Sequence, residues 1–255
     1  MKDHLLFAEW LLCWHAANYA VMSDPVRGDQ THSEAATSAA ANGRAWFIQV
    51  ALRSIAAGVA VIFAGHFDRR AIFTGAIVLT GSILIPVARR RFVPVRVLGE
   101  FELLANAGIA VLLWFMSHGL PGRNLPVETA TGANRLAAIC LCAALFVYAV
   151  RGGTYLVRGI LEKAGGIPRP AIVSSEGYTH GRFIGQVERA IVFLIVIAGN
   201  LAALAFFFAA KGLIRSRELE ERDRVDYLLL GSLSSFLVAL AAGLVAQRIL
   251  PFLWQ

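Results

Sequence analysis

The chain has 255 residues, of which 57% are hydrophobic and only 16% are charged, and its mean hydropathy is +0.62. Soluble domains carry about 25% charged residues, so this deficit excludes an ordinary soluble class and favours a membrane protein. The net charge of +7 comes from residues that lie mostly at the ends of apolar segments, where Lys and Arg act as membrane anchors and topology signals. Because no basic patch with interleaved aromatic residues stands on a soluble region, nucleic acid is not expected as a partner.

Seven apolar segments follow one another along the chain, and most are long enough for a helix across the ~30 Å hydrocarbon core of a bilayer. In chain order they cover residues 5–22, 45–65, 71–88, 97–116, 136–150, 190–210 and 227–246. The sequence therefore predicts an all-α fold, a polytopic transmembrane helical bundle of about seven spans. We expect residues 1–255 to form a single integral-membrane domain.

Three regions depart from this simple pattern. Polar residues interrupt the first segment, so whether it spans stays open; these are Glu9, His15 and Asn18. Residues 23–44, of which Thr31–Asn42 are rich in Ala, Ser and Thr, are expected to form a mobile polar loop. After the fifth segment, one face carries Tyr155, Leu156, Ile160 and Leu161. That pattern predicts an amphipathic helix on the bilayer surface, within an interfacial helix and loop that cover residues 152–180.

The distribution of basic residues leaves the orientation open. With seven spans, thirteen Lys and Arg residues fall on one side and ten on the other, which only slightly favours an outside N-terminus. The two strongest basic blocks flank the sixth segment and contradict each other. Either one block is exported or the number of spans differs from seven.

Five polar residues are candidates for a site within the membrane: Gln49, Arg53, Glu102, Asn106 and Asn200. Gln49 and Arg53 lie one helical turn apart, as do Glu102 and Asn106, so each pair shares a face. If the two faces meet, they form a proton or ion path or a polar cavity. The alternative is an interhelical hydrogen-bond network that fixes the packing, with Arg53 reaching toward the interface.

The most structured motif directly precedes the sixth segment and covers residues 181–189, with the sequence GRFIGQVER. Gly181 and Gly185 would let another helix approach closely. A helix that begins here could bind a lipid phosphate or another anion through its free N–H groups and Arg182. The candidates for an anion or lipid-headgroup site are Gly181, Arg182, Gly185, Arg189, Lys211 and Arg215. The alternative is a topology anchor with close helix packing.

Residues 178–246 resemble a bacterial integral-membrane family known as a domain of unknown function. The elements that carry the resemblance are Gly181-Arg182-x-Ile184-Gly185-x-x-Glu188-Arg189, then Ala209-Ala210-Lys211 with Arg215, then Tyr227-Leu228-Leu229-x-Gly231-Ser232-Leu233-Ser234-Ser235. The family pattern has His and Asp at four-residue spacing in its N-terminal helices. This chain has Trp14 and Asn18, or Glu102 and Asn106, at plausible positions instead, so a metal or acid–base role does not carry over. The resemblance implies a multi-pass protein of the bacterial cytoplasmic membrane and supplies no activity.

Motifs for catalysis and cofactor binding are missing from the sequence. It contains no His-Glu-x-x-His, Gly-x-Ser-x-Gly, Walker loop or dinucleotide fingerprint. Its three cysteines, Cys13, Cys140 and Cys142, fall in apolar stretches, where they are expected to be small buried hydrophobes. We therefore expect no cofactor and no metal, and no catalytic residue can be named.

Three classes of function remain open. The first is a lipid-contacting binding or scaffold subunit of a membrane assembly, with anionic membrane lipids and a protein partner or a second copy of the chain as its partners. The second is a transporter or permease for a small or lipid-like substrate, which would use Arg53, Glu102 and Asn200. The third is a membrane-embedded lipid-modifying enzyme, although the chain lacks paired catalytic groups.

Overall fold

The computed structural model of the chain describes residues 3–19, 35–64, 69–118, 127–164, 175–216, 222–249 and Pro251, without the side chains at several helix ends. All regular structure in these ranges is helical, which confirms the predicted fold class. Five helices in these ranges are long and apolar enough to cross a membrane: Trp46–Ala64, Ala71–Arg89, Leu98–His118, Asn134–Lys163 and Leu229–Ile249. They correspond to the second, third, fourth, fifth and seventh predicted segments. The prediction of about seven spans is therefore slightly too high.

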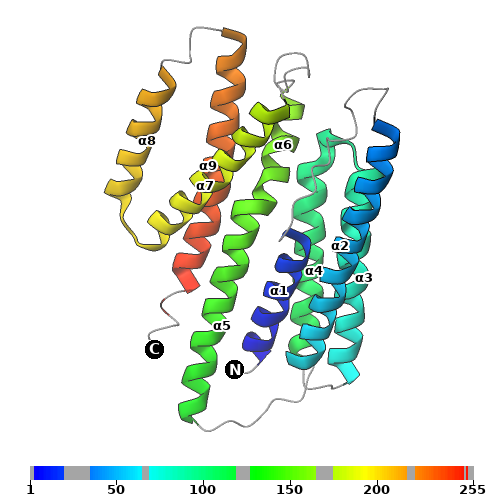
Figure 1. Cartoon of the computed structure of the whole chain (residues 1–255). Helices are drawn as coiled ribbons and strands as arrows, with labels where there is room; N and C mark the ends of the chain where they lie inside the picture. The colour runs from blue at the N-terminus through cyan, green and yellow to red at the C-terminus, as the bar shows by residue number, and fades with distance from the viewer. Residues whose placement is uncertain are drawn as a thin grey trace. The chain divides into compact units, whose positions relative to one another are not determined.

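The chain divides into two compact units, and the first comprises Met1–Val93 and Ala105–Ala144. It contains α1 (Asp3–Tyr19), α2 (Ala35–Ala64), α3 (Arg69–Arg91) and parts of α4 (Leu98–His118) and α5 (Val127–Val147) (Figure 1). Helix α2 begins at Ala35, so the last ten residues of the predicted polar loop 23–44 are helical. The rest of that loop lies outside the described residues.

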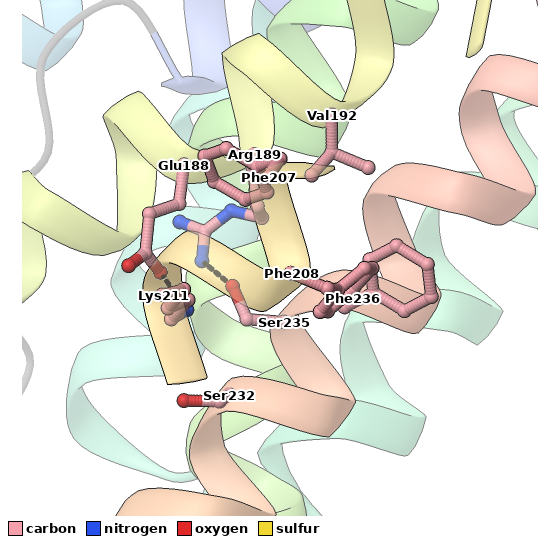
Figure 2. Close-up of a pocket in the computed structure, with 9 residues that line it drawn as sticks. All are labelled: Glu188, Arg189, Val192, Phe207, Phe208, Lys211, Ser232, Ser235 and Phe236. Atoms are coloured by element: carbon pink, nitrogen blue, oxygen red, sulfur yellow. Dashed lines mark hydrogen bonds and ion pairs between the residues drawn. The ribbon is translucent and has the colours of Figure 1, made fainter. Parts of the chain in front are cut away.

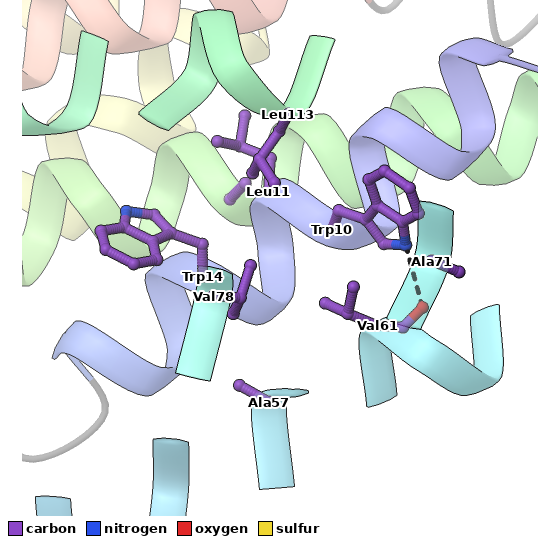
Figure 3. Close-up of a cluster of buried hydrophobic side chains, with 9 residues drawn as sticks. Trp10, Leu11, Trp14, Ala57, Val61, Ala71, Val78 and Leu113 are labelled. Atoms are coloured by element: carbon purple, nitrogen blue, oxygen red, sulfur yellow. Dashed lines mark hydrogen bonds between the residues drawn. The ribbon is translucent and has the colours of Figure 1, made fainter. Parts of the chain in front are cut away.

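Small residues and two tryptophans build the core of this first unit. A Cβ on Gly75 would lie 2.9 Å from the carbonyl oxygen of Gly58, so α2 and α3 approach more closely than side chains would allow. Trp10 and Trp14 of α1 are fully buried against this pair of helices. The indole Nε1 of Trp10 donates to the Val61 carbonyl at 3.1 Å (Figure 3), which satisfies a polar group that burial would otherwise leave unpaired.

The second unit comprises Pro94–Leu104 and Leu145–Gln255. After the short helix η2 (Val95–Val97) and the start of α4, it contains the π-helix η3 (Tyr148–Gly152), then α6 (Gly153–Lys163), α7 (Ser175–Ile197), α8 (Leu201–Ser216) and α9 (Arg222–Ile249). Helices α5, η3 and α6 follow without a break, so α6 extends the fifth span and is not a separate surface helix as predicted.

Most of the predicted apolar face of α6 is buried within the protein, and only Ile160 on that face is exposed, at 41%. Tyr155 and Leu156 are 2% and 8% exposed, and Arg158 on the predicted polar face is also 8% exposed. Gly153 at the start of α6 is a packing position, because a Cβ on it would lie 2.9 Å from Cγ1 of Val238. Glycine is tolerated inside membrane helices when a neighbouring helix covers it. A short surface helix needs a face that water covers, and α6 has none at these residues.

The sixth predicted segment, residues 190–210, is a helical hairpin and not a single span. Helix α7 ends at Ile197 and α8 begins at Leu201, and Figure 1 shows the two helices as limbs that meet at the turn. Gly199 has φ +68°, a left-handed conformation that glycine adopts without strain. Its N–H donates to Val196 at 3.0 Å, and the N–H of Asn200 donates to Ile195 at 3.3 Å. These two bonds form a Schellman motif, the usual end of an α-helix at a glycine.

The same turn also starts the returning helix. The side-chain Oδ1 of Asn200 accepts from the N–H of Ala203 at 3.0 Å, and its carbonyl accepts from the N–H of Leu204 at 3.3 Å. Asn200 is thus the N-cap of α8, one of the residues that helix starts prefer. Asn200 was predicted as a polar site within a span. It is instead part of the turn that divides the sixth predicted segment into two helices.

Replacement of Gly159 tests the close packing of α6 in the second unit. A Cβ at Gly159 would lie 2.6 Å from the backbone nitrogen of Gly99, so Gly159→Ala must move a helix and should cost about 1–3 kcal/mol of unfolding free energy. Gly132→Ala is the matched control, because nothing lies within 4 Å of its Cβ. Thermal unfolding in detergent, followed by tryptophan fluorescence, should show a lower Tm for Gly159→Ala only. Equal Tm values for the two variants would contradict this packing.

Candidate functional site

Charged and hydroxyl side chains of the second unit gather at the open end of the α7–α8 hairpin. Figure 2 shows Glu188 and Arg189 on α7, Lys211 on α8, and Ser232 and Ser235 on α9. We call these five residues the hairpin cluster. All five belong to the three sequence stretches that carry the family resemblance, so the structure brings residues of all three together.

Arg189 is the centre of the hairpin cluster. Its side chain is only 4% exposed, and its Nε and Nη2 both donate to the carbonyl oxygen of Val150, at 3.1 and 2.7 Å. Nη2 also donates to Oγ1 of Thr154 at 2.6 Å, and Nη1 donates to Oγ of Ser235 at 2.9 Å. Four of the five guanidinium N–H groups are therefore used. The guanidinium joins α6 and the π-helix to both α7 and α9.

The π-helix and a glycine prepare the place for this guanidinium. Val150 lies within the π-helix Tyr148–Gly152, where the backbone departs from the regular i→i−4 ladder. Its carbonyl oxygen accepts two N–H groups of Arg189. A Cβ on Gly153 would lie 3.4 Å from both Cδ and Nε of Arg189, so a larger residue would crowd the side chain. Local backbone geometry and a missing side chain together admit the arginine.

A second charged contact lies beside Arg189. Lys211 Nζ forms an ion pair with Oε2 of Glu188, and these side chains are 16% and 20% exposed respectively. The two residues stand twelve and eleven positions from Gly199 along opposite limbs, so their contact shows that the limbs run back alongside each other. With Arg189 included, the cluster holds two cations and one carboxylate.

The cavity inside the hairpin cluster is small. The centre of a water molecule can move over about 10 Å³ there, and Phe207, Phe208 and Phe236 form much of the wall. That volume is about the minimum that admits one water molecule. Ser232 Oγ lines the same cavity and is buried with no hydrogen-bond partner among the described residues. The cavity therefore suits one ordered water and is too small for a substrate.

In the first unit, Asn106 forms a hydrogen-bond network between α1 and α4. Its Oδ1 accepts from Nε1 of Trp14 at 3.1 Å, and its Nδ2 donates to the Tyr19 hydroxyl at 2.7 Å. The guanidinium carbon of Arg89 lies 5.7 Å from the centroid of the Tyr19 ring, within cation–π range. For Asn106, these contacts match the alternative of an interhelical hydrogen-bond network that fixes the packing.

The other predicted site residues are distributed over both units. Nη2 of Arg53 donates to Oε1 of Gln49 at 3.4 Å on the same helix face, as the spacing predicts. Glu102 is fully buried but belongs to the second unit, so its pairing with Arg53 stays a prediction. A Cβ on Gly185 would lie 3.5 Å from Nη1 of Arg189. Gly181, Arg182 and Arg215 lie in α7 and α8, and their side chains are outside the description.

A groove on the first unit was not predicted from the sequence. Arg69 and Phe73 at the start of α3, and Phe115 and Met116 near the end of α4, line an open groove of about 420 Å³. Phe73 and Phe115 are 62% and 70% exposed. One feature of the sequence could have indicated the groove. Arg69 stands one helical turn before Phe73 at the start of a span, a pattern typical of membrane interfaces. We call this feature the Arg69 groove.

The described residues contain no group of three or more His, Cys, Asp and Glu side chains placed to hold a metal ion. No protein-family model matches the chain, and no curated protein or solved structure shows a significant similarity to it. The family resemblance of residues 178–246 therefore stays a prediction.

Arg189 variants test the role of the hairpin cluster. Arg189→Ala leaves the Val150 carbonyl, Thr154 and Ser235 without the donor they now share, at a cost of about 1–3 kcal/mol for each buried polar group left unsatisfied. Arg189→Lys keeps the charge but cannot form the planar fork, so it should also lower the Tm in detergent. The control is Arg135→Ala, which removes an exposed arginine. Wild-type Tm values for both Arg189 variants would show that the guanidinium does not hold these helices together.

Proposed function

We propose that the protein is a multi-pass membrane protein that binds anionic lipid and acts as a binding or scaffold subunit of a membrane assembly. Its expected location is the cytoplasmic membrane of a bacterium. A protein partner or a second copy of the chain would complete the assembly.

The Arg69 groove carries this proposal. Exposed Phe73 and Phe115, with Met116, offer an apolar surface to an acyl chain, while Arg69 at the start of α3 stands beside them. The planar guanidinium can bind two oxygen atoms of a phosphate through two parallel hydrogen bonds. The volume of about 420 Å³ lies within the range of ~300–1,000 Å³ that is usual for small-molecule sites. A cation beside an apolar groove matches a phospholipid, which joins a phosphate to acyl chains.

The hairpin cluster supports a binding or scaffold role over a catalytic one. Glu188 and Lys211 bind each other, and Arg189 binds neutral oxygen atoms of the surrounding helices. Their cavity admits about one water molecule. An acid or base used in catalysis must reach a substrate within hydrogen-bond distance, whereas these groups are committed to contacts within the protein.

Lipid retention by groove variants tests the proposed function. Native mass spectrometry of gently extracted protein should show a bound phospholipid on the wild type and on Arg135→Ala. The adduct should fall about tenfold or more on Arg69→Ala, because a hydrogen bond to a charged group contributes about 1.5–3 kcal/mol. Arg135 is a fair control because it is an exposed arginine that does not line the groove. The same lipid distribution on all three proteins would refute headgroup binding by Arg69.

A transporter for a small or lipid-like substrate is the second candidate, and the hairpin cluster is the observation that favours it. Ser232 and Ser235 lie three and six residues inside the apolar stretch Leu229–Ile249, so the charges beside them are about 5–9 Å from its end. Ionisable groups at such depth are costly and often mark ion or substrate paths.

Water access to Ser232 distinguishes these two functions. In a protein whose Cys13, Cys140 and Cys142 are replaced by alanine, Ser232→Cys should resist small hydrophilic thiol reagents if the cavity is closed, as the binding role predicts. Rapid reaction from either side of the membrane would establish a water-filled path and favour transport. Phe206→Cys, at an exposed position of α8, is the control. Its labelling rate shows how far surrounding lipid alone slows the reagent.

A further inference from the structure

Helix α7 follows α9 along most of its apolar length. Nη1 of Arg189 contacts Ser235, a Cβ on Gly243 would lie 2.9 Å from Cβ of Val196, and a Cβ on Gly199 would lie 3.3 Å from Nε2 of Gln247. These three contacts advance along α9 in order, over twelve residues or about 18 Å. The turn of the hairpin thus stands beside Gln247, near the end of the stretch Leu229–Ile249.

Helix α8 meets the same neighbour through side chains. The Phe208 and Phe236 rings meet edge to face with centroids 4.2 Å apart, and Lys211 reaches Glu188 at the open end of the hairpin. The outward faces are apolar, since Leu194 is 57% and Phe206 is 76% exposed. The turn supplies hydrogen-bond partners for the helix ends that meet there, as hydrocarbon surroundings require. The exposed apolar side chains and the satisfied turn both suit a hairpin whose outward face meets acyl chains.

We infer that the α7–α8 hairpin enters and leaves the membrane on the same side, and that this side faces the anionic lipids of the cytoplasmic leaflet. A single crossing by residues 190–210 would place the segments before α7 and after α8 on opposite sides. A hairpin places them together. This assignment does not depend on lipid binding in the Arg69 groove.

The hairpin changes the distribution of charge across the membrane. With five spans and a hairpin, one side collects three basic residues before Trp46, four from Arg89 to Arg96 and nine from Lys163 to Arg224, a total of sixteen. Arg53, Arg151 and Arg158 lie inside spans and are not counted. The other side collects only Arg69, Arg70, Arg123, Arg135 and Arg248. If α1 also spans, Lys2 alone changes sides. The positive-inside rule then assigns the first side to the cytoplasm.

The two basic blocks that contradict each other in a seven-span chain now agree. The basic block before the hairpin and the basic block after it both fall on the side with the larger positive charge. Clusters of Lys and Arg at the cytoplasmic ends of membrane helices are attracted to anionic lipids. The structure thus removes the conflict without exporting either block.

Cysteine accessibility tests this assignment directly. In the protein free of native cysteines, single substitutions are placed before the hairpin (Ala164→Cys), after it (Glu218→Cys) and at the other end of the α5–α6 span (Gly132→Cys). Ala164 is exposed at the end of α6, and nothing lies within 4 Å of a Cβ on Gly132. A membrane-impermeant maleimide should label Ala164→Cys and Glu218→Cys in inverted vesicles only, and Gly132→Cys in intact spheroplasts only.

Two results would overturn the inference. Labelling of Ala164→Cys and Glu218→Cys from opposite sides would show a single crossing between them. Labelling of both from the outside would keep the hairpin but reverse the orientation. Should the cysteine-free protein fail to fold, a short epitope inserted at Glu218 of the wild type provides the same information: antibody must bind it in inverted vesicles and not in spheroplasts.

Discussion

The guanidinium of Arg189 joins the helices of the C-terminal unit at one point. It donates to a carbonyl in the π-helix, to a hydroxyl on α6 and to a hydroxyl on α9. A buried cation without a carboxylate among these acceptors is costly unless its donors are satisfied. The surrounding helices must therefore place hydrogen-bond acceptors around the N–H groups of the guanidinium. The π-helical turn, Gly153 and the position of Ser235 on α9 can each be understood as parts of this single arrangement.

The Gly199–Asn200 turn has the largest consequence for how the protein lies in a membrane. Apolar length alone indicates that residues 190–210 cross the bilayer once, yet two residues end one helix and begin another within that length. The ion pair between Glu188 and Lys211 then falls at the open end of the hairpin. Residues 190–210 are apolar enough to cross the membrane once. The contacts at the turn and at the open end explain why the chain instead returns to the side from which it entered.

Much of the fold follows from the sequence, because hydropathy over about 20 residues is a direct measure of the cost of burial in lipid. Five spans were recognisable in this way, and Arg189 and Lys211 were among the residues predicted as candidates for an anion site. The hairpin was missed because Gly-Asn, an ordinary turn signal, is brief against a long apolar run. The partners of Arg189 were not predictable. Val150 and Thr154 lie 39 and 35 residues away, and their contact depends on the register between helices.

The distance between the two limbs of the hairpin tests this account most directly. Spin labels at Val187→Cys and Gly212→Cys in the cysteine-free protein would occupy an exposed residue and an open glycine position. Packed helices have axes about 8–10 Å apart. Pulsed electron–electron double resonance in lipid should therefore give a distance between the two labels shorter than about 25 Å. A continuous helix would separate the same positions by about 37 Å. A distribution centred near the longer value would contradict the hairpin and the membrane topology inferred from it.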